Sequence, residues 1–492
     1  MLSVLMIAAE AAPYAKVGGL GDVAGTLPKR LAERGLKVSV YLPYYSQIRE
    51  SGREPEMMDR HFTLRHAGKA RRVRVGREVS DGVDFFFIEE ATYFRRDGIY
   101  GPHGGDFPDN AQRYSFLVRA ALAAAASDRL PDLIHCHDWH GALAPVYLSY
   151  GDAAPGWRSV PTILTIHNLA HQGVFDAGIF PDLGLPARAY APDCLEHFGS
   201  VNFLKAGILK ADYVTTVSPT YAREITGPEL GFGLDGVLAA RGGRLVGIAN
   251  GIDYETWNPR TDLSLPVPFD GDQLEARERG KNLLREELRL DPQRRSPLFT
   301  FVGRLVHQKG ADLLAGIIPG MVDNGLQISV LGSGQREIED RFRMLAGSHP
   351  GRVSVTIGFD EPLSRRLYAG SDFFVMPSRF EPCGLGQMIA MRYGCLPVVR
   401  RTGGLVDTVF DLSADPEGGN GFVFDGPGEI DLREAVTRAA RFFRTGDREA
   451  VIKRIMALDN SWRHAAGLYL DLYRKSVRAA PEGPSKEDTD DG

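Results

Sequence analysis

Two stretches of this chain indicate its architecture most clearly, SRFEPCGLG at residues 378–386 and KVGGLGD at residues 16–22. Each stretch places a charged side chain, Glu381 or Lys16, beside glycines where an apolar run gives way to a helix-like run. Glycines let the backbone approach a ligand closely, and the free N–H groups at a helix N-terminus favour an anion. Two such elements far apart in one chain indicate a diphosphate-bearing ligand held between two α/β domains.

Bulk composition narrows the class of protein. With 492 residues the chain is too long for one hydrophobic core, so we expect two domains. The formal net charge of −5 argues against a nucleic-acid partner, because such proteins usually carry a basic surplus. Four widely spaced cysteines without a CxxC pair indicate a reducing compartment and argue against a zinc site.

The apolar N-terminus loosely resembles a signal peptide. However, the run at residues 2–9 is short and no Lys or Arg precedes Lys16, so a buried parallel strand explains it better. No segment approaches the ~18–20 apolar residues of a membrane span. We therefore expect a soluble, cytoplasmic protein without a membrane partner.

Short apolar runs alternate with amphipathic segments along the whole chain, which is typical of parallel βαβ units with strands buried on both faces. Strands are predicted at residues 2–9, 37–42, 83–88, 132–136, 162–166, 213–217, 298–302, 327–331, 353–357, 373–376 and 396–399. Helices are predicted at residues 110–126, 364–370, 385–393 and 449–474. Two doubly wound sheets are the simplest arrangement.

The border between the domains is predicted near residues 245–253, where ANGID forms a turn after a strand and Gly242 and Gly243 suit a hinge. We therefore predict a Rossmann-like acceptor-side domain over residues 1–245. A second Rossmann-like domain over residues 246–478 would bind the donor, and its final helix would pack back on the first domain. The tail at residues 479–492 is rich in Pro, Glu, Asp, Ser and Gly and is predicted to be disordered.

Two more motifs of the second half follow predicted strands. In GRLVHQKG, Arg304 and Lys309 come directly after a strand, at the sheet edge where open α/β folds bind ligands. A planar guanidinium and a point charge suit a diphosphate, although two surface cations are the alternative. RTGGL at residues 401–405 is a further glycine turn, whose backbone amides could also bind the diphosphate.

The first half offers HCHDWH at residues 135–140 and TIHN at residues 165–168. Three histidines in six residues raise the question of zinc, but no further ligand cluster has a matching spacing. We therefore interpret Asp138 as a polar group facing the ligand, and His167 as either a ligand contact or a satisfied core histidine. For Glu381 the alternative is a helix cap, which the following proline weakens.

In order, KVGGLGDV, HCHDWH, TIHN, IANGID, GRLVHQKG, PSRFEPCGLGQ and RRTGGLVDTV resemble the motifs of bacterial-type glycogen (starch) synthases, over about residues 2–470. The resemblance implies the GT-B fold, with two Rossmann-like doubly wound domains facing an interdomain cleft. It implies a retaining glucosyltransferase that uses ADP-glucose to extend the non-reducing end of an α-1,4-glucan such as glycogen. No cofactor and no metal are implied, because Arg and Lys can stabilise the departing diphosphate.

The resemblance also implies roles for individual residues. Glu381, His167 and Asp138 would be the catalytic residues, with Glu381 steadying positive charge at the anomeric carbon and His167 holding a sugar hydroxyl. The donor would be bound by Lys16, Gly18, Gly19, Asn250, Arg304, Lys309, Gly384, Leu385, Thr402, Gly403 and Gly404. Asp22 and Tyr100 would lie on the acceptor side. Wider relatives carry a second glutamate where this chain has Ile389, so we expect retention without a covalent glycosyl-enzyme.

Other functions remain open at this point. A UDP-glucose-dependent glucosyltransferase with another acceptor would differ only in its base pocket and acceptor surface. A phosphorylase would need lysine-bound pyridoxal phosphate, and a non-catalytic glucan-binding protein would not need the Lys16, Arg304, Lys309 and Glu381 set. A nicotinamide dehydrogenase is disfavoured, because no GxGxxG with a following acidic residue comes after the first strand.

Overall fold

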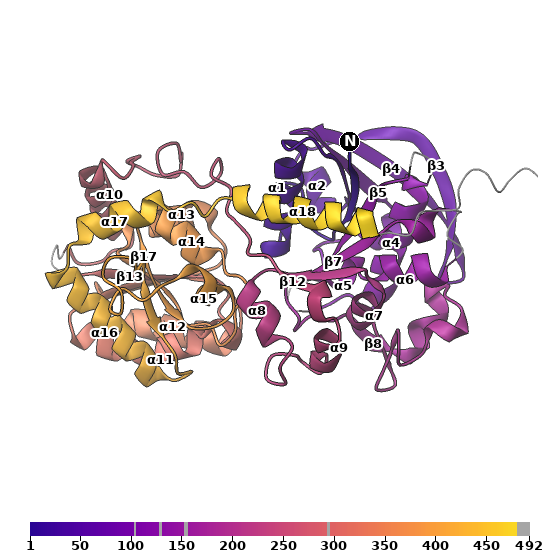
Figure 1. Ribbon diagram of the computed structural model, residues 1–492. Helices are drawn as coiled ribbons and strands as arrows, with labels where there is room; N and C mark the ends of the chain where they lie inside the picture. The colour runs from indigo at the N-terminus through magenta and orange to yellow at the C-terminus, as the bar shows by residue number, and fades with distance from the viewer. Residues whose placement is uncertain (103–104, 127–129, 152–155, 293–295, 480–492) are drawn as a thin grey trace, which may run out of the picture. The chain divides into compact units, whose positions relative to one another are not determined.

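The structure is a computed structural model that describes residues 1–102, 105–126, 130–151, 156–292 and 296–479 (Figure 1). Except for Ala479, the tail predicted to be disordered lies outside these residues. The chain divides into two compact units. Unit 1 comprises Met1–Val217, Ala222–Ile248 and the chain from Trp462 onward, and unit 2 comprises Ser218–Tyr221 and Ala249–Ser461.

Unit 1 is built on a nine-stranded sheet of order β12-β11-β7-β6-β1-β2-β5-β4-β3. The strands are β1 (Ser3–Ile7), β2 (Lys37–Pro43), β3 (Glu56–His66), β4 (Lys69–Ser80), β5 (Val83–Glu89), β6 (Leu133–His137), β7 (Thr162–Ile166), β11 (Tyr213–Thr216) and β12 (Leu245–Gly247). From β12 to β5 all neighbours are parallel. The central strands β6 and β7 are buried at every position, and polar side chains within them are paired inside the sheet, as His135 is with the Thr165 hydroxyl at 2.6 Å.

One edge of this sheet departs from the purely parallel arrangement that we expected. Strands β3 and β4 form an antiparallel hairpin, and β4 also pairs antiparallel with β5. The hairpin was not predicted because its sequence, such as KARRVRV at residues 69–75, is rich in arginine. The side chains of β4 alternate in burial over much of its length, as expected for a strand with one solvated face.

Helices and a small second sheet complete unit 1. The helices are α1 (Gly19–Ala32), α2 (Ser46–Glu50), α3 (Ala91–Phe94), α4 (Asn110–Ala125), α5 (Asp138–Gly141), α6 (Leu143–Tyr150), α7 (Phe203–Lys210), α8 (Pro219–Glu224, which starts in the short segment of unit 2), α9 (Asp235–Ala239) and α18 (Trp462–Ala479). Short 3-10 turns lie at Trp157–Ser159, Ala177–Leu183, Ala187–Ala189 and Gly242–Arg244. The small sheet has the order β8-β10-β9, formed by Val174–Asp176, Ser200–Asn202 and Glu196–His197.

The C-terminal helix α18 packs beside α1 at the start of the chain (Figure 1). Our prediction of a single helix over residues 449–474 was wrong: α17 (Arg448–Ala457) and α18 are separate helices. The break falls in a turn in which the carboxylate of Asp459 accepts a hydrogen bond from the Ser461 amide at 3.0 Å. This local bond offers the backbone an alternative to the helix.

Unit 2 contains a six-stranded, fully parallel sheet of order β15-β14-β13-β16-β17-β18. Its strands are β13 (Leu298–Val302), β14 (Gln327–Gly332), β15 (Val353–Ile357), β16 (Phe373–Met376), β17 (Leu396–Arg400) and β18 (Phe422–Phe424). Its helices are α10 (Leu274–Glu287), α11 (Ala311–Asp323), α12 (Arg336–Ser348), α13 (Glu361–Gly370), α14 (Gly386–Arg392), α15 (Gly404–Thr408), α16 (Glu429–Thr445) and α17, with a 3-10 turn at His307–Lys309. This is the doubly wound order 3-2-1-4-5-6.

In both sheets the strand order reverses next to the first strand of the unit. The reversal lies between β1 and β6 in unit 1 and between β13 and β16 in unit 2. Open α/β sheets bind ligands at this switch point, outside the carboxyl ends of the strands. Four of the motifs singled out in the sequence follow these four strands: KVGGLGD after β1, HCHDWH at the end of β6, GRLVHQKG after β13 and SRFEPCGLG after β16.

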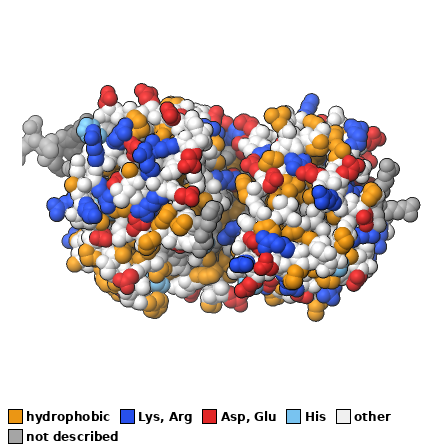
Figure 2. Space-filling model, turned by 180° about the vertical axis from the view of Figure 1, so that it is seen from behind, with side chains coloured by type: hydrophobic (Ala, Val, Ile, Leu, Met, Phe, Trp, Pro, Cys, Tyr) orange, Lys and Arg blue, Asp and Glu red, His pale blue; other side chains and the backbone are white. Residues whose placement is uncertain are grey.

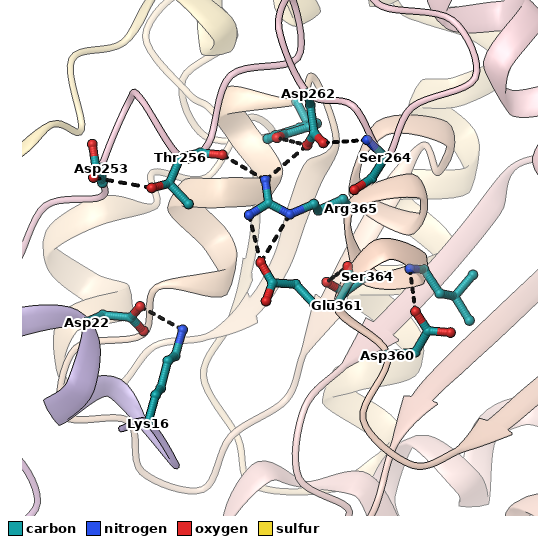
Figure 3. A network of polar contacts seen from close by, with 12 residues as sticks. Lys16, Asp22, Asp253, Thr256, Asp262, Ser264, Asp360, Glu361, Ser364 and Arg365 are labelled. Atoms are coloured by element: carbon teal, nitrogen blue, oxygen red, sulfur yellow. Dashed lines mark hydrogen bonds and ion pairs between the residues drawn. The ribbon is translucent and has the colours of Figure 1, made fainter. Parts of the chain in front are cut away.

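A polar network ties the segment before α10 to α13 within unit 2. The guanidinium of Arg365 donates to the carbonyl oxygen of Thr256 at 2.7 Å and to the carboxylates of Asp262 and Glu361 at 3.1 and 2.7 Å (Figure 3). The same guanidinium lies 4.2 Å from the ring centroid of Trp257. These contacts hold the start of the unit firmly on its core.

The surface carries charges of both signs. Lys and Arg side chains are interspersed with Asp and Glu on the face that Figure 2 shows. Within the described part of the chain, none of the helices combines the length and the apolar character needed to cross a bilayer.

Candidate active site

At the switch point of unit 1, the residue that organises the KVGG loop is Glu10, which the sequence analysis did not single out. Its carboxylate oxygen Oε2 accepts hydrogen bonds from the amides of Val17 at 2.6 Å and Gly18 at 2.9 Å. The hydroxyl of Tyr100 donates to the other oxygen, Oε1. Glu10 is only 3% exposed. The Gly18 amide, predicted to approach the donor, is therefore engaged by an internal carboxylate.

The two charged residues of the same loop face each other. The ammonium of Lys16 lies 2.6 Å from the carboxylate of Asp22, in the first turn of α1 (Figure 3). Both side chains keep access to solvent, with exposed fractions of 41% and 29%. An exposed pair of this kind contributes little to stability, so a bound phosphate could exchange for the carboxylate at small cost.

Tyr100, predicted on the acceptor side, joins this group through Glu10. Its ring also stacks on the ring of His140, with centroids 4.9 Å apart. Burial raises the pKa of Tyr100 well above its usual value, and the nearby Glu10 charge raises it further. Tyr100 therefore stays a neutral hydrogen-bond donor.

The ends of β6 and β7 bring Asp138 and His167, two of the predicted site residues, together. The Asp138 carboxylate accepts a hydrogen bond from the His167 amide at 2.7 Å. Asp138 has a φ of +50°, a left-handed conformation that is strained for a residue other than glycine and that tends to occur at functional sites. Burial raises the pKa of Asp138 to about 7, while hydrogen bonds from the backbone of His167 and Asn168 act in the opposite direction.

The three histidines of HCHDWH are buried, and their rings contact side chains inside unit 1. The ring of His135 bonds to the hydroxyl of Tyr473 on α18 at 2.7 Å and to that of Thr165 at 2.6 Å. Nδ1 of His137 lies 3.0 Å from Nε2 of His167. In the described ranges, no group of three or more His, Cys, Asp or Glu side chains is arranged to hold a metal ion.

At the switch point of unit 2, Glu381 and Lys309 form an ion pair. The Lys309 ammonium lies 2.6 Å from Oε2 of Glu381, and the Ser378 hydroxyl donates to the same oxygen at 2.9 Å. Arg304, the other predicted cation, is exposed and donates to the Gln308 side chain at 3.2 Å. Lys309 and Ser378 thus hold the Glu381 carboxylate in place, whereas the guanidinium of Arg304 remains exposed to solvent.

Two glycines let the loops of unit 2 approach each other this closely. Gly310, directly after Lys309, has a φ of +66°, and a Cβ there would lie 2.0 Å from the carbonyl oxygen of Pro377. At Gly404 a Cβ would lie 2.2 Å from the carbonyl oxygen of Cys383. The Gly404 amide donates to the carbonyl oxygen of Glu381 at 3.0 Å. The turn around Gly404 therefore supports the loop that carries Glu381, and this amide is not free for a phosphate here.

The remaining predicted donor residues lie around the same loops. Gly384 has a φ of +73°, and Leu385 precedes α14, which begins at Gly386. Thr402 is buried, and Gly403 directly precedes α15. The structure therefore places these four residues after β16 and β17, at the carboxyl edge of the unit 2 sheet.

Asn250 is the residue of unit 2 whose surroundings point most directly to a ligand. The residue is 7% exposed, and among the described residues its Oδ1 has no hydrogen-bond partner. Its backbone hydrogen-bonds Cys383. A buried acceptor without a donor is rare in folded proteins, so a ligand hydroxyl would satisfy it. Cys383 itself is buried, and burial raises the pKa of its thiol to about 12, so it is a packed residue.

Comparison with known proteins identifies both halves of the chain. Residues 3–240 match the starch synthase catalytic domain family, and residues 296–441 match glycosyl transferases group 1. The chain is 41% identical to a glycogen synthase of Syntrophotalea carbinolica, over 97% of this chain and 99% of the relative. It is 44% identical to a glycogen synthase of Anaeromyxobacter dehalogenans, over 96% and 99%.

A solved structure extends the likeness to three dimensions. The catalytic domain of starch synthase IV from Arabidopsis thaliana, solved with ADP and acarbose, is 36% identical and superposes with a TM-score of 0.90. The match covers 97% of this chain and 99% of that one. It confirms the predicted GT-B class, in which each sheet is doubly wound. On this combined evidence, the chain belongs to the glycogen and starch synthase family of glycosyltransferases.

Proposed function

We propose that this protein is a glycogen synthase that transfers glucose from ADP-glucose to the non-reducing end of an α-1,4-glucan, with retention of the anomeric configuration. The observation that carries the proposal is the pair of Lys309 and Glu381, held 2.6 Å apart at the switch point of a doubly wound sheet. The names of the relatives support glycogen as the product, and the ADP and acarbose of the starch synthase IV structure support the donor and acceptor classes.

The ion pair suggests how donor binding would prepare the site. Lys309 and Ser378 both bind the same oxygen of Glu381. A diphosphate offers Lys309 an alternative anionic partner. The freed carboxylate would then steady positive charge at the anomeric carbon as the bond to ADP breaks. Lys309 and the solvent-exposed Arg304 would stabilise the charge that develops on ADP, which is the main task of catalysis in such a transfer.

Sugar contacts would come from residues that the structure places at the carboxyl ends of strands. His167 and Asp138 would bind hydroxyls of the transferred glucose, and Asn250 would use its unpartnered oxygen to accept a hydrogen bond from another. Lys16, Gly18, Gly19, Gly384, Leu385, Thr402, Gly403 and Gly404 remain proposed donor contacts. Asp22 and Tyr100 remain proposed contacts of the acceptor chain.

The proposal also covers metals and cofactors, the place of action and the partners. Because Arg and Lys can supply the positive charge, we propose transfer without a metal or cofactor. We also propose that the enzyme acts in the cytoplasm, without nucleic-acid or membrane partners.

The test is incorporation of labelled glucose into glycogen, with ADP-glucose and UDP-glucose in parallel and EDTA in half of the samples. ADP-glucose should be the better donor, EDTA should leave the rate unchanged, and an α-1,4-specific glucosidase should release the label. Glu381→Gln, which keeps the size of the side chain, should abolish incorporation. Faster transfer from UDP-glucose would favour the alternative donor, and no transfer from either would refute the proposal.

A further inference from the structure

His137 and His167 form a direct side-chain contact at the carboxyl ends of two central strands of the unit 1 sheet. His137 is the last residue of β6, and His167 follows the last residue of the neighbouring parallel strand β7. Nδ1 of His137 and Nε2 of His167 lie 3.0 Å apart. Two nitrogen atoms at this distance share one proton in a hydrogen bond, so one ring must donate and the other must accept.

The surroundings of His137 decide which ring donates. Burial lowers the pKa of His137 to about 3, so the ring is neutral and carries a single N–H. Its other nitrogen, Nε2, is buried and has no hydrogen-bond partner among the described residues. A proton on Nε2 would therefore be a buried N–H without an acceptor, which folded proteins avoid more strictly than an unused acceptor. The proton belongs on Nδ1, and His137 donates to His167.

This choice fixes the tautomer of His167. Burial, followed by the neighbouring His137 and His140, lowers the pKa of His167 well below its usual value, so this ring is also neutral. Its Nε2 accepts the proton of His137, which leaves its own proton on Nδ1. The backbone of His167 is held separately, because its amide donates to Asp138 at 2.7 Å. Ring and backbone are thus anchored by two consecutive residues, His137 and Asp138.

We propose that His137 is a positioning residue that holds His167 with its proton on Nδ1, so that His167 offers an N–H donor to a hydroxyl oxygen of the sugar substrate. This inference rests on the proposed function, in which His167 contacts the transferred glucose. With the proton on the opposite nitrogen, His167 would only accept at Nδ1. The hydroxyl would then have to donate, and its remaining contacts would have to rearrange. His137 therefore acts on the reaction by setting which group donates in the hydrogen bond between His167 and the sugar hydroxyl.

The tautomer can be measured on the resting protein. Selective ¹⁵N labelling of the 12 histidines separates protonated from unprotonated ring nitrogens by their shifts and couplings. His137→Asn and His167→Asn identify the two rings by the loss of their signals. We expect a protonated Nδ1 and a bare Nε2 on His167 in the wild-type protein. A proton on Nε2 of His167 would overturn the inference, whether or not the protein transfers glucose.

Kinetics test the consequence with a matched pair of variants. In His137→Asn the side-chain amide can still donate from near the position of Nδ1, whereas His137→Leu has a similar shape and no donor. From the usual value of one hydrogen bond, we expect His137→Leu to lower kcat/KM about tenfold and His137→Asn to lower it by less. In a His167→Ala background, His137→Leu should have little further effect. Equal losses in both backgrounds, or in both variants, would refute a role through His167.

Because the NMR measurement needs no substrate, it separates this inference from the proposed function. The expected tautomer without any glucose transfer would leave the positioning intact and refute the function. Glucose transfer with the opposite tautomer would refute the positioning alone.

Discussion

The ion pair of Lys309 and Glu381 predicts that Lys309→Ala damages both stability and catalysis. The Glu381 side chain is 6% exposed, and among the described residues the Ser378 hydroxyl, at 2.9 Å, is the hydrogen-bond donor that remains to its carboxylate once the ammonium is removed. The substitution also removes the positive charge that we assign to the departing diphosphate. The two losses are measured independently, so one variant tests two parts of the reasoning.

The expected magnitude follows from the burial of the pair. Exposed ion pairs contribute about 0.2–1 kcal/mol, and removing one partner of a buried pair costs about 3–5 kcal/mol. The Lys309 side chain is 20% exposed, so this pair lies between the two cases. We therefore expect the free energy of unfolding to fall by about 2 kcal/mol. In a unit of this size that loss corresponds to a fall in Tm of about 4–8 °C.

Arg304→Ala is the matched control for stability. Arg304 is exposed and its hydrogen bond to Gln308 is long, so its removal should leave Tm within about 1 °C. Both variants should lower kcat/KM for ADP-glucose, with a loss of about 10²–10³ for Lys309→Ala, the usual cost of one preorganised charge. Thermal unfolding and initial rates of glucose incorporation measure the two effects. An unchanged kcat/KM in Lys309→Ala would refute the phosphate assignment, and an unchanged Tm would refute the structural value of the pair.

Three further predictions concern buried groups. Glu10→Ala should lower the free energy of unfolding by about 1–3 kcal/mol, because the amides of Val17 and Gly18 and the hydroxyl of Tyr100 lose their charged acceptor, which water can only partly replace. Glu10→Gln should cost less in urea titrations, since its amide oxygen can still accept from the two backbone amides. Between pH about 4 and 7 the folded protein keeps a proton on Asp138 that the unfolded chain has released, so the wild type loses stability as the pH rises. Asp138→Asn lacks this group, so its free energy of unfolding relative to wild type should rise across this window and level off above it. A constant difference would contradict the raised pKa. Because burial raises the pKa of the Cys383 thiol to about 12, the native protein should react slowly with iodoacetamide at pH 8, and alkylation of Cys383 at the rate of an exposed thiol would contradict its burial.

Most of the parallel core could be predicted from the sequence, because its strands are short and mostly apolar runs that alternate with amphipathic segments. The hairpin of β3 and β4 could not, since an edge strand with one solvated face tolerates the arginines of residues 69–75. The break between α17 and α18 was missed although Asp459 and Asn460 are typical turn residues. Apolar residues recur at helical spacing on both sides of these two residues, and this pattern predicts one continuous helix.

The sequence singled out many of the residues that the structure places at the two switch points, but not the contacts between them. Motif order indicated Lys309 and Glu381, yet nothing local to either motif shows that they pair across 72 residues of chain. Glu10 was overlooked because it lies among alanines directly after β1 and looks like part of a buried strand. A signal was present, since a carboxylate inside an apolar segment has to find donors, and the following loop offers several.

The assignment of α18 to unit 1 has a consequence for biosynthesis. The hydroxyl of Tyr473 bonds to His135 in the central strand β6, and α18 packs on α1. The main segment of unit 2, Ala249–Ser461, is therefore translated between the body of unit 1 and its last helix. While the chain emerges from the ribosome, unit 1 lacks its final helix until unit 2 has been synthesised. The first part of the enzyme to be made is therefore the last to be completed, and a premature stop before Trp462, where α18 begins, would leave unit 1 without the helix that packs on α1 and bonds to β6.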